Sequence, residues 1–407
     1  MSCEIGKKFI SYNESIEILN SINISKRATQ KVYLMESLGK VLASDIIASS
    51  NYPEYPTSAM DGYAIRYQDQ ELGKIKISGI NPAGSDEDLE VVTGICIKTF
   101  TGSLMPKGSD TLIPIENVEV KDGHIKIISS VPFGFATRKV GESYFAGDVL
   151  IKSGTTIGFA QIGVMAGLNI VQVEVFQAPT IAIASTGSEI LDLGEIQTNK
   201  AQIRSSNHLT LEAIAKQNGA NVHQMGVVKD DKETILELIK NGLSSSDIVV
   251  TTGGVSVGDY DFVKDIIREE LGATVLFQGV NIKPGQHVII AQKEDKFIVG
   301  LPGFAYSSTV TFILYVLPLL FKLRGGEEKL KIVKAILDEP KNPKGNKTIF
   351  EACNINLIDG EYHIDFADKK NGTSAILTNM LGSCALMVIG EDKASLCVGD
   401  KVDVIIL

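Results

Sequence analysis

The chain has 407 residues, 44% of them hydrophobic and 22% charged, with a formal net charge of −10. This is the composition of a folded globular protein, and the length exceeds that of one ordinary domain. The acidic balance argues against a nucleic-acid partner, because nonspecific binding depends on Lys and Arg that neutralise phosphates, but it still allows a local basic pocket for a small anion.

The N-terminal part predicts two helical stretches followed by a β-rich region. The first begins at a capping serine, Ser11 or Ser15, and the second carries apolar residues from Val32 to Leu42. From Asn51 to about Val175, turns rich in Gly, Pro, Asn and Asp separate short β-type runs. The runs are Ile75–Ser78, Ile95–Phe100, Thr111–Ile115 and Ile125–Ile128.

Strands and helices then alternate from about residue 180 to residue 324, which predicts a doubly wound parallel sheet. The expected strands are Thr180–Ser185, Asn221–Val227, Ile248–Thr252, Val288–Ala291 and Phe297–Val299. The expected helices are Asn207–Asn218, Lys232–Asn241 and Asp261–Leu271, followed by an apolar helix around Thr309–Phe321. Short strands return over roughly the last 80 residues and predict a small β-domain.

Neither cysteine usage nor hydropathy indicates secretion or a membrane span. The five cysteines are odd in number and form no CxxC pair, which favours a reducing cytoplasm and gives no zinc spacing. The N-terminus has no apolar core of a signal peptide. The run Thr309–Phe321 contains Pro318 and is about a dozen residues long, too short to span a bilayer. We therefore expect a cytoplasmic protein with no membrane contact.

Glycine- and hydroxyl-rich motifs follow the central strands, at the positions where ligands bind in open α/β sheets. Ser185–Glu189 and Thr251–Asp261 combine glycines, which allow close backbone approach, with Ser and Thr hydroxyls that suit an anion. The second motif lacks the Walker A and dinucleotide patterns. The first is read equally well as a capped turn, whereas the length of the second makes it more specific.

Three shorter motifs are weaker. Lys283-Pro284-Gly285 can present a lysine to an oxyanion, although a surface turn is the better interpretation of this tripeptide alone. Gly300–Gly303 leads into the apolar helix, whose N-terminus can bind an anion or simply begin there. Asp230 and Asp231 can hold Mg²⁺, cap the next helix, or do both.

Together these motifs resemble the MoeA family, which includes the gephyrin E domain. The matching stretches are PTSAMDGYA at 56–64, FTGSLMPKGSDTLIPIE at 100–116, STGSEI at 185–190, TTGGVSVGDYDF at 251–262, IKPG at 282–285 and GLPG at 300–303. They occur in the family order.

The resemblance implies a multidomain α/β fold, with a central MogA/MoaB-like domain, β-rich N-terminal modules and a small C-terminal β-barrel. It predicts an N-terminal domain at 1–50 and 140–178, an inserted domain at 51–139, a molybdopterin-binding domain at 179–324 and a barrel at 328–407. It also implies a homodimer that inserts molybdate into adenylylated molybdopterin with Mg²⁺ and releases AMP. A MogA-type adenylyltransferase is a possible donor of the substrate.

The resemblance also assigns site residues. Those expected to hold the pterin and its phosphate are Thr186, Gly187, Ser188, Glu189, Thr252, Gly253, Gly254, Ser256, Gly258, Pro302 and Gly303. Metal is expected at Glu189, Asp230 and Asp261. The catalytic residues would be Asp61, Thr101, Asp261 and Lys283, with Asp61 and Thr101 supplied by the second subunit.

Four positions depart from the family pattern: Ser143 stands where the resemblance implies an aspartate, Gly279 and Gln286 where it implies lysines, and Phe304 where it implies an asparagine. Fewer cations hold an oxyanion less firmly. Two alternatives therefore stay open, a paralogue selective for tungstate and a catalytically weak molybdopterin-binding scaffold. A molybdopterin adenylyltransferase is disfavoured, because those smaller proteins lack the flanking domains.

Overall fold

The computed structural model describes residues 9–24, 28–255, 262–326, 329–343, 345–370, 374–392 and 395–407. The chain forms two compact units. The β unit consists of Asp45–Ser153 and Ala160–Ile170, and the α/β–barrel unit consists of Met1–Ser44, Gly154–Phe159 and Val171–Leu407. The four-part division expected from the sequence stays a prediction.

The β unit is built on a six-stranded sheet in the order β7-β4-β6-β5-β9-β8. Its apolar core includes Tyr63, Ile75 and Ile113, and the four strands expected here are confirmed. The strands are β4 (Gly62–Ile65), β5 (Ile75–Asn81), β6 (Ile95–Thr99), β7 (Thr111–Pro114), β8 (Val118–Lys121) and β9 (His124–Ile127). Short pairs join β2 (Ile46–Ile47) to β11 (Val149–Ile151), and β3 (Thr57–Ser58) to β10 (Thr137–Arg138).

One of the two helices expected in the N-terminal part needs correction. The first helix, α1 (Tyr12–Ser21), is confirmed, and the Ser11 side chain caps it by accepting from the Glu14 N–H at 3.1 Å. The second helical stretch is wrong, because β1 (Thr29–Tyr33) pairs antiparallel with β12 (Gln172–Phe176) and a short 3-10 turn, η1 (Leu34–Ser37), follows. The distant partner strand satisfies these backbone groups, which local periodicity does not reveal.

A helix also occurs where only strands were expected. This helix, α2 (Phe159–Gly167), contains two glycines in its second half, which weaken the helical signal in the sequence.

The central sheet has the order β16-β13-β17-β21-β20-β18. Its first four strands are parallel: β16 (Asn221–Val228), β13 (Thr180–Thr186), β17 (Ile248–Thr252) and β21 (Lys296–Leu301). The sequence predicted a wholly parallel sheet, but β20 (Ile289–Lys293) pairs antiparallel with both of its neighbours, β21 and β18 (Thr274–Gln278). A tight turn links β20 to β21, so this end of the sheet is a hairpin rather than a crossover.

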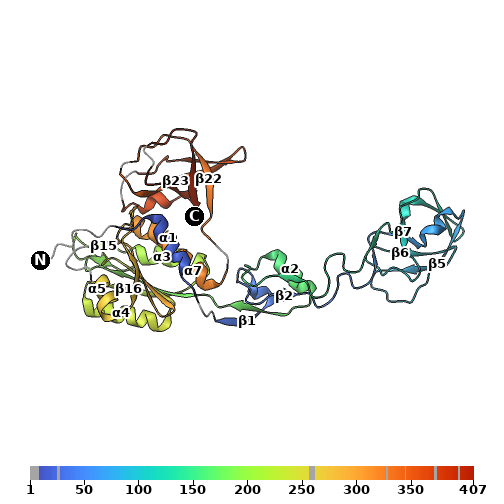
Figure 1. Ribbon diagram of the computed structural model, residues 1–407, viewed down its shortest axis with the longest axis horizontal. Coiled ribbons are helices and arrows are strands. Elements are labelled where there is room, and N and C mark those ends of the chain that lie inside the picture. Colours follow the sequence, from blue (N-terminus) through green and yellow to red (C-terminus); the bar gives the residue numbers. More distant parts are fainter. Residues whose placement is uncertain are drawn as a thin grey trace. The chain divides into compact units, whose positions relative to one another are not determined.

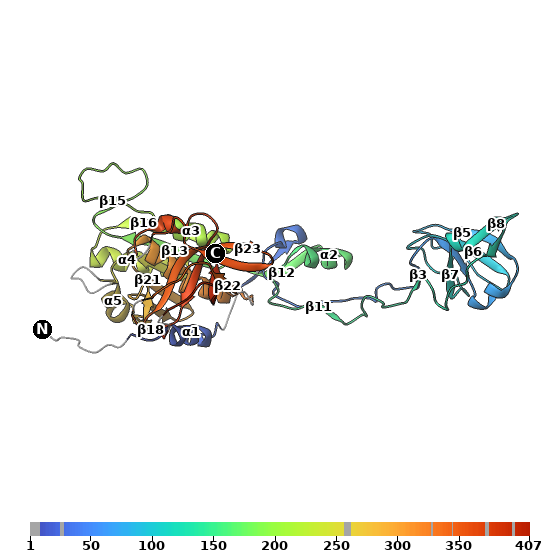
Figure 2. The same cartoon turned by 90° about the horizontal axis from the view of Figure 1, so that it is seen from above.

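Helices cover both faces of this sheet, as a doubly wound fold requires (Figures 1 and 2). Alternate side chains of β13 point to opposite faces of the sheet. Ile181 and Ile183 belong to the apolar core that includes residues of α3 (Asn207–Gln217), whereas Ala182 and Ala184 belong to the core that includes residues of α4 (Lys232–Ser245). The helix expected at Asp261–Leu271 is a single turn, α5 (Val263–Asp265), followed by a π-helical turn, η4 (Ile266–Glu270). Asp261 lies outside the described residues.

The apolar helix is longer than the sequence indicated. It runs as α6 (Ala305–Thr311), a π-helical turn η5 (Phe312–Val316) and α7 (Leu317–Arg324). Pro318 follows the π turn, where the missing N–H is tolerated. Within the described residues, Ala305–Arg324 is long and apolar enough to cross a membrane, yet 89% of its most apolar window is buried inside the protein. This burial identifies it as the expected core helix.

The C-terminal strands close into a five-stranded barrel. Their order is β23-β24-β22-β26-β25, and β25 pairs back to β23. The strands are β22 (Ile332–Leu337), β23 (Thr348–Ile358), β24 (Glu361–Asp365), β25 (Cys384–Ile389) and β26 (Lys401–Ile406). From the central domain, β19 (Ile282–Lys283) adds to β23 in parallel, so the barrel and the α/β domain share a sheet edge. The expected barrel is confirmed.

Candidate functional site

The glycine motifs converge at one edge of the central sheet. The strands β13, β17 and β21 end in register, with Ser185 opposite Thr252 and Thr252 opposite Leu301. Since these strands are parallel, the loops that follow them leave the sheet on the same side. The motifs at 185–189, 251–255 and 300–303 therefore lie together at this edge, as one candidate site.

Close backbone packing shapes this site, which we call the cradle (Thr186–Glu189, Gly253–Gly254 and Pro302–Gly303). Gly253 has φ +97°, and a Cβ there would lie 2.7 Å from the Thr186 carbonyl oxygen and 2.8 Å from its Oγ1. A Cβ on Gly303 would lie 3.6 Å from the Cα of Gly253. Three loops thus meet backbone to backbone, without intervening side chains.

The hydroxyl of Thr186 stands out because it is buried and unsatisfied. Thr186 is 3% exposed, and its Oγ1 has no hydrogen-bond partner among the described residues. A buried polar group without a partner is costly, so it suits a site that a polar ligand completes. The residues present therefore fit an anion with acceptor oxygens.

Beneath the cradle, buried hydroxyls and an amide connect two of its loops. Ser185 Oγ lies 2.9 Å from Thr252 Oγ1, and the Asn207 amide donates to the Gly303 carbonyl at 2.7 Å. The same amide lies 3.4 Å from Thr252 Oγ1. Phe304, which departs from the family pattern, follows Gly303, the acceptor of the Asn207 bond. Its side chain is 62% exposed and does not cap α6.

Two expected metal ligands flank the turn after β13. Asp230 Oδ2 accepts from the Ser188 N–H at 3.1 Å, and Glu189 Oε2 lies 3.1 Å from the position that a Cβ on Gly187 would take. The neighbouring Asp231 caps α4 instead, accepting from the N–H and hydroxyl of Thr234 at 2.8 and 2.7 Å. These bonds, the hydroxyl first, lower the pKa of Asp231.

Asp261, Ser256 and Gly258 lie outside the described residues. Within the described part of the chain, no group of three or more His, Cys, Asp or Glu side chains gathers closely enough to hold a metal. Hard carboxylate oxygens at Glu189 and Asp230 nevertheless match the ligands that Mg²⁺ prefers.

In the β unit, Asp61 and Thr101 lie together. Asp61 Oδ1 accepts from both the backbone N–H and the hydroxyl of Thr101, each at 2.8 Å. These bonds hold the pKa of Asp61 below its ordinary value, the backbone bond contributing most, with a smaller contribution from the charge of Lys98. Asp61 is an exposed carboxylate that stays ionised at neutral pH.

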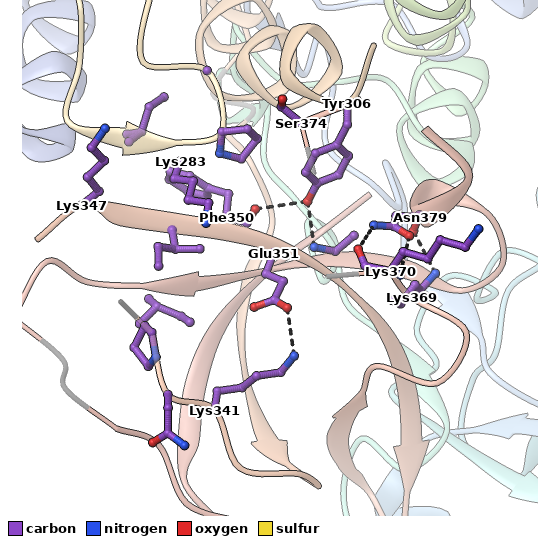
Figure 3. Close-up of a pocket in the computed structure, with 18 of the residues that line it drawn as sticks. Lys283, Tyr306, Lys341, Lys347, Phe350, Glu351, Lys369, Lys370, Ser374 and Asn379 are labelled. Atoms are coloured by element: carbon purple, nitrogen blue, oxygen red, sulfur yellow. Dashed lines mark hydrogen bonds and ion pairs between the residues drawn. The ribbon is translucent and has the colours of Figure 1, made fainter. Parts of the chain in front are cut away.

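The lysine pocket is a cavity of about 660 Å³ between the Lys283 loop and the barrel (Figure 3). Two glutamates, Glu339 and Glu351, line it beside five lysines: Lys283, Lys341, Lys347, Lys369 and Lys370. The Lys283 turn was read as a surface turn on its motif alone, but the structure makes it one wall of this pocket. An excess of positive charge in a concave site of an acidic protein favours an anionic ligand.

Most of this charge has no carboxylate partner. Lys341 pairs with Glu351 at 2.9 Å, and Glu339 accepts from the Phe366 N–H at 2.8 Å. The Lys369 ammonium donates to the carbonyls of Asn379 and Leu381. No carboxylate of the described residues lies within 4 Å of the other three ammonium groups, those of Lys283, Lys347 and Lys370.

The structure also explains two departures from the family wording. Gln286, where the family has lysine, accepts from the Lys347 ammonium, so a cation from the barrel reaches that position. Gly279 has φ +77°, and a Cβ there would lie 2.3 Å from the Phe9 ring, so a lysine side chain does not fit. Sequence reasoning missed the four barrel lysines, because they are spread over 30 residues without a motif.

The fold is that of a protein built around an α/β domain whose strand ends carry the cradle. Residues 182–322 match the model of a probable molybdopterin binding domain, and residues 10–168 match the MoeA N-terminal region, domains I and II.

Relatives of known activity are similar to this chain over most of its length. A molybdopterin molybdenumtransferase of Nostoc sp. is 32% identical over 90% of this chain and 86% of the relative, and one of Staphylococcus epidermidis is 33% identical over 82% and 80%. The crystal structure of the molybdopterin biosynthesis moeA protein from Pyrococcus horikoshii OT3 has a TM-score of 0.83 at 28% identity, covering 98% of this chain and all of that one. The chain belongs to the MoeA family of molybdopterin molybdenumtransferases.

Proposed function

We propose that this protein inserts molybdenum from molybdate into adenylylated molybdopterin and releases AMP. The observation that carries the proposal is the cradle, where the buried Thr186 hydroxyl lacks a partner and three loops meet against glycine backbone. This arrangement supports binding of the pterin and its phosphate. The residues are Thr186, Gly187, Ser188, Glu189, Thr252, Gly253, Gly254, Ser256, Gly258, Pro302 and Gly303.

Glu189 and Asp230, with Asp261, are the proposed ligands of Mg²⁺. The support is their carboxylate chemistry and the contact of Asp230 with the Ser188 turn. When bound, Mg²⁺ screens the negative charge that develops as the phosphoanhydride breaks. Ser188 holds Asp230 in position through its N–H.

The lysine pocket is the proposed molybdate site. Lys283 offers an ammonium to the oxyanion from the α/β domain, and the Lys347 and Lys370 side chains extend from the barrel. A dianion gains from cations that carry no carboxylate partner, since no existing ion pair has to be broken.

We further propose that the enzyme is a cytoplasmic homodimer in which Asp61 and Thr101 complete the site of the other subunit. Their support is chemical: an ionised, exposed carboxylate fixed by a neighbouring threonine. A MogA-type adenylyltransferase would hand over the adenylylated pterin.

The deciding experiment incubates the purified protein with adenylylated molybdopterin, Mg²⁺ and molybdate and follows AMP release. AMP at the background rate contradicts the transferase proposal, and tight pterin binding without turnover supports a scaffold instead. A parallel series with tungstate distinguishes a tungstate-selective paralogue. Sedimentation of the full chain tests the dimer.

A further inference from the structure

The ion pair between Lys341 and Glu351 is the part of the lysine pocket that the proposed oxyanion site does not use. Lys341 Nζ and Glu351 Oε1 lie 2.9 Å apart, and the two side chains are only 12% and 26% exposed. Both residues line the pocket, and Figure 3 shows the Glu351 carboxylate bonded to the Lys341 ammonium. Breaking such a pair is costly, because the remaining charge stays where water hydrates it poorly.

The structure anchors Lys341 at three points. Its backbone exchanges hydrogen bonds with Leu396 at 2.9 and 2.8 Å, and its ammonium donates to Glu351. The same ammonium lies 3.2 Å from the centroid of the Phe366 ring, which is 6% exposed, so this cation–π contact is made away from bulk water. The Lys341 ammonium is therefore committed to Glu351 and Phe366.

Without Lys341, the Glu351 carboxylate would oppose oxyanion binding in this pocket. An ionised carboxylate only accepts hydrogen bonds, and it repels an anion whose oxygens are also acceptors. The other carboxylate of the pocket, Glu339, is turned to the barrel backbone, where it accepts from the Phe366 N–H at 2.8 Å. With Glu351 paired, the charged groups that remain for a ligand are lysine ammonium groups, which only donate.

Oxyanions differ in whether they bring a hydrogen of their own. At neutral pH molybdate carries none and all its oxygens only accept, whereas much of the inorganic phosphate is hydrogenphosphate, whose O–H donates. A free carboxylate among the lysines favours the anion that brings a hydrogen and disfavours the one that does not. The pairing of Glu351 therefore bears on which oxyanion the pocket binds.

We propose that Lys341 sets the oxyanion specificity of the lysine pocket by occupying the Glu351 carboxylate, so that the pocket favours molybdate over hydrogenphosphate. This inference rests on the proposed function, in which the pocket takes molybdate. Lys341 acts through Glu351 and not by contact with the oxyanion, so it is a positioning residue. The specificity arises because an acceptor that the competing ligand would use is already satisfied.

Titration calorimetry of the full chain with molybdate tests whether Lys341 acts through Glu351. Lys341→Met keeps an unbranched side chain against the ring but leaves Glu351 unpaired, so the Kd for molybdate should rise about tenfold or more. In Lys341→Met/Glu351→Gln the carboxylate is gone as well, and the Kd should return to within about threefold of the wild-type value. A double variant that binds no better than Lys341→Met overturns the proposal, because Lys341 would then bind the oxyanion itself.

Glu351→Gln alone is a test that does not depend on the folding of Lys341→Met. It removes one negative charge from the pocket and keeps the shape of the side chain, so molybdate should bind at least as tightly as to the wild type. A Kd raised by more than about threefold overturns the proposal, since Glu351 would then hold Lys341 in place for contact with the oxyanion.

Competition with inorganic phosphate near neutral pH measures the specificity itself. The ratio of the phosphate Kd to the molybdate Kd should fall about tenfold or more in Lys341→Met and recover in the double variant. An unchanged ratio overturns the proposal even if both affinities fall, because a merely structural change lowers both alike. Failure of the wild type to bind molybdate contradicts the proposed molybdate site, whereas wild-type binding that Lys341→Met leaves intact overturns this inference alone.

Lys401 and Glu361 are the matched control pair. Their Nζ and Oε1 atoms also lie 2.9 Å apart in the barrel, but the side chains are 63% and 57% exposed and neither residue lines the pocket. Lys401→Met should leave the two affinities and their ratio unchanged. A shift of the ratio as large as that in Lys341→Met overturns the assignment to Lys341.

Discussion

Lys347, at the start of β23 in the barrel, donates its ammonium to the Oε1 of Gln286 in the loop after β19. The contact brings a cation from one domain to a position where the other domain has lost one. Because β19 pairs with β23, with Ile282 opposite Thr348, the backbone itself fixes this proximity. The charge of the lysine pocket is therefore a product of two domains.

Lys283→Ala should raise the molybdate concentration needed for half-maximal AMP release about tenfold or more, since a hydrogen bond to a charged group contributes about 1.5–3 kcal/mol. Lys283 is exposed, so the melting temperature should change little. Lys401→Ala is the control, because Lys401 pairs with Glu361 and neither residue lines the pocket. Equal molybdate dependence in Lys283→Ala and the wild type would remove Lys283 from the oxyanion site.

Thr186→Val should bind molybdopterin about tenfold more weakly while remaining as stable as the wild type or more so. The valine has the same shape and removes a buried hydroxyl that has no partner among the described residues. Thr251→Val is the matched control: Thr251 Oγ1 is also buried and unsatisfied, but Thr251 lies within β17, opposite Ala184, and is not part of the cradle loops. Ligand titration and thermal unfolding separate the two effects, and an affinity loss equal in both variants contradicts a specific role for Thr186.

Thr101→Val should raise the pKa of Asp61 toward its ordinary value, because it removes the hydroxyl bond and keeps the backbone bond. Since Asp61 must be ionised in the proposed site, the acid limb of the activity profile should move to higher pH. Carboxyl carbon-13 spectra report the titration directly. An Asp61 titration unaffected by this change would show that the hydroxyl does not hold the carboxylate.

Asp230→Asn and Asp231→Asn should separate metal binding from helix capping. Asp230→Asn should raise the Mg²⁺ concentration required for activity, whereas Asp231→Asn should change both this concentration and the melting temperature little, because asparagine caps a helix about as well as aspartate. The lowered pKa of Asp231 means that its capping contribution is complete above its unfolded pKa and is lost as the pH falls through the folded one. A larger Mg²⁺ effect in Asp231→Asn would reverse the assignment.

The sequence predicted those elements whose signals are local. Ser11 and Asp231 each predicted the start of a helix. The apolar run of β13 predicted a strand that is covered on both faces of the sheet. The sequence-based prediction was wrong where pairing with a distant strand determines the secondary structure. Val32 belongs to a strand rather than a helix, because its backbone pairs with Val173, far along the chain.

The central motifs could be recognised one by one from the sequence, as could the kind of ligand their glycines and hydroxyls suit. Only the tertiary structure determined which of these residues are buried, which contacts they make with one another and which of them line a pocket. It left Thr186 Oγ1 buried without a partner, assigned Asp230 and Asp231 to different contacts, and turned the Lys283 turn into the wall of a pocket. Composition and spacing determine which chemistry a segment can offer, but burial and charge pairing depend on contacts between segments that the chain order does not specify.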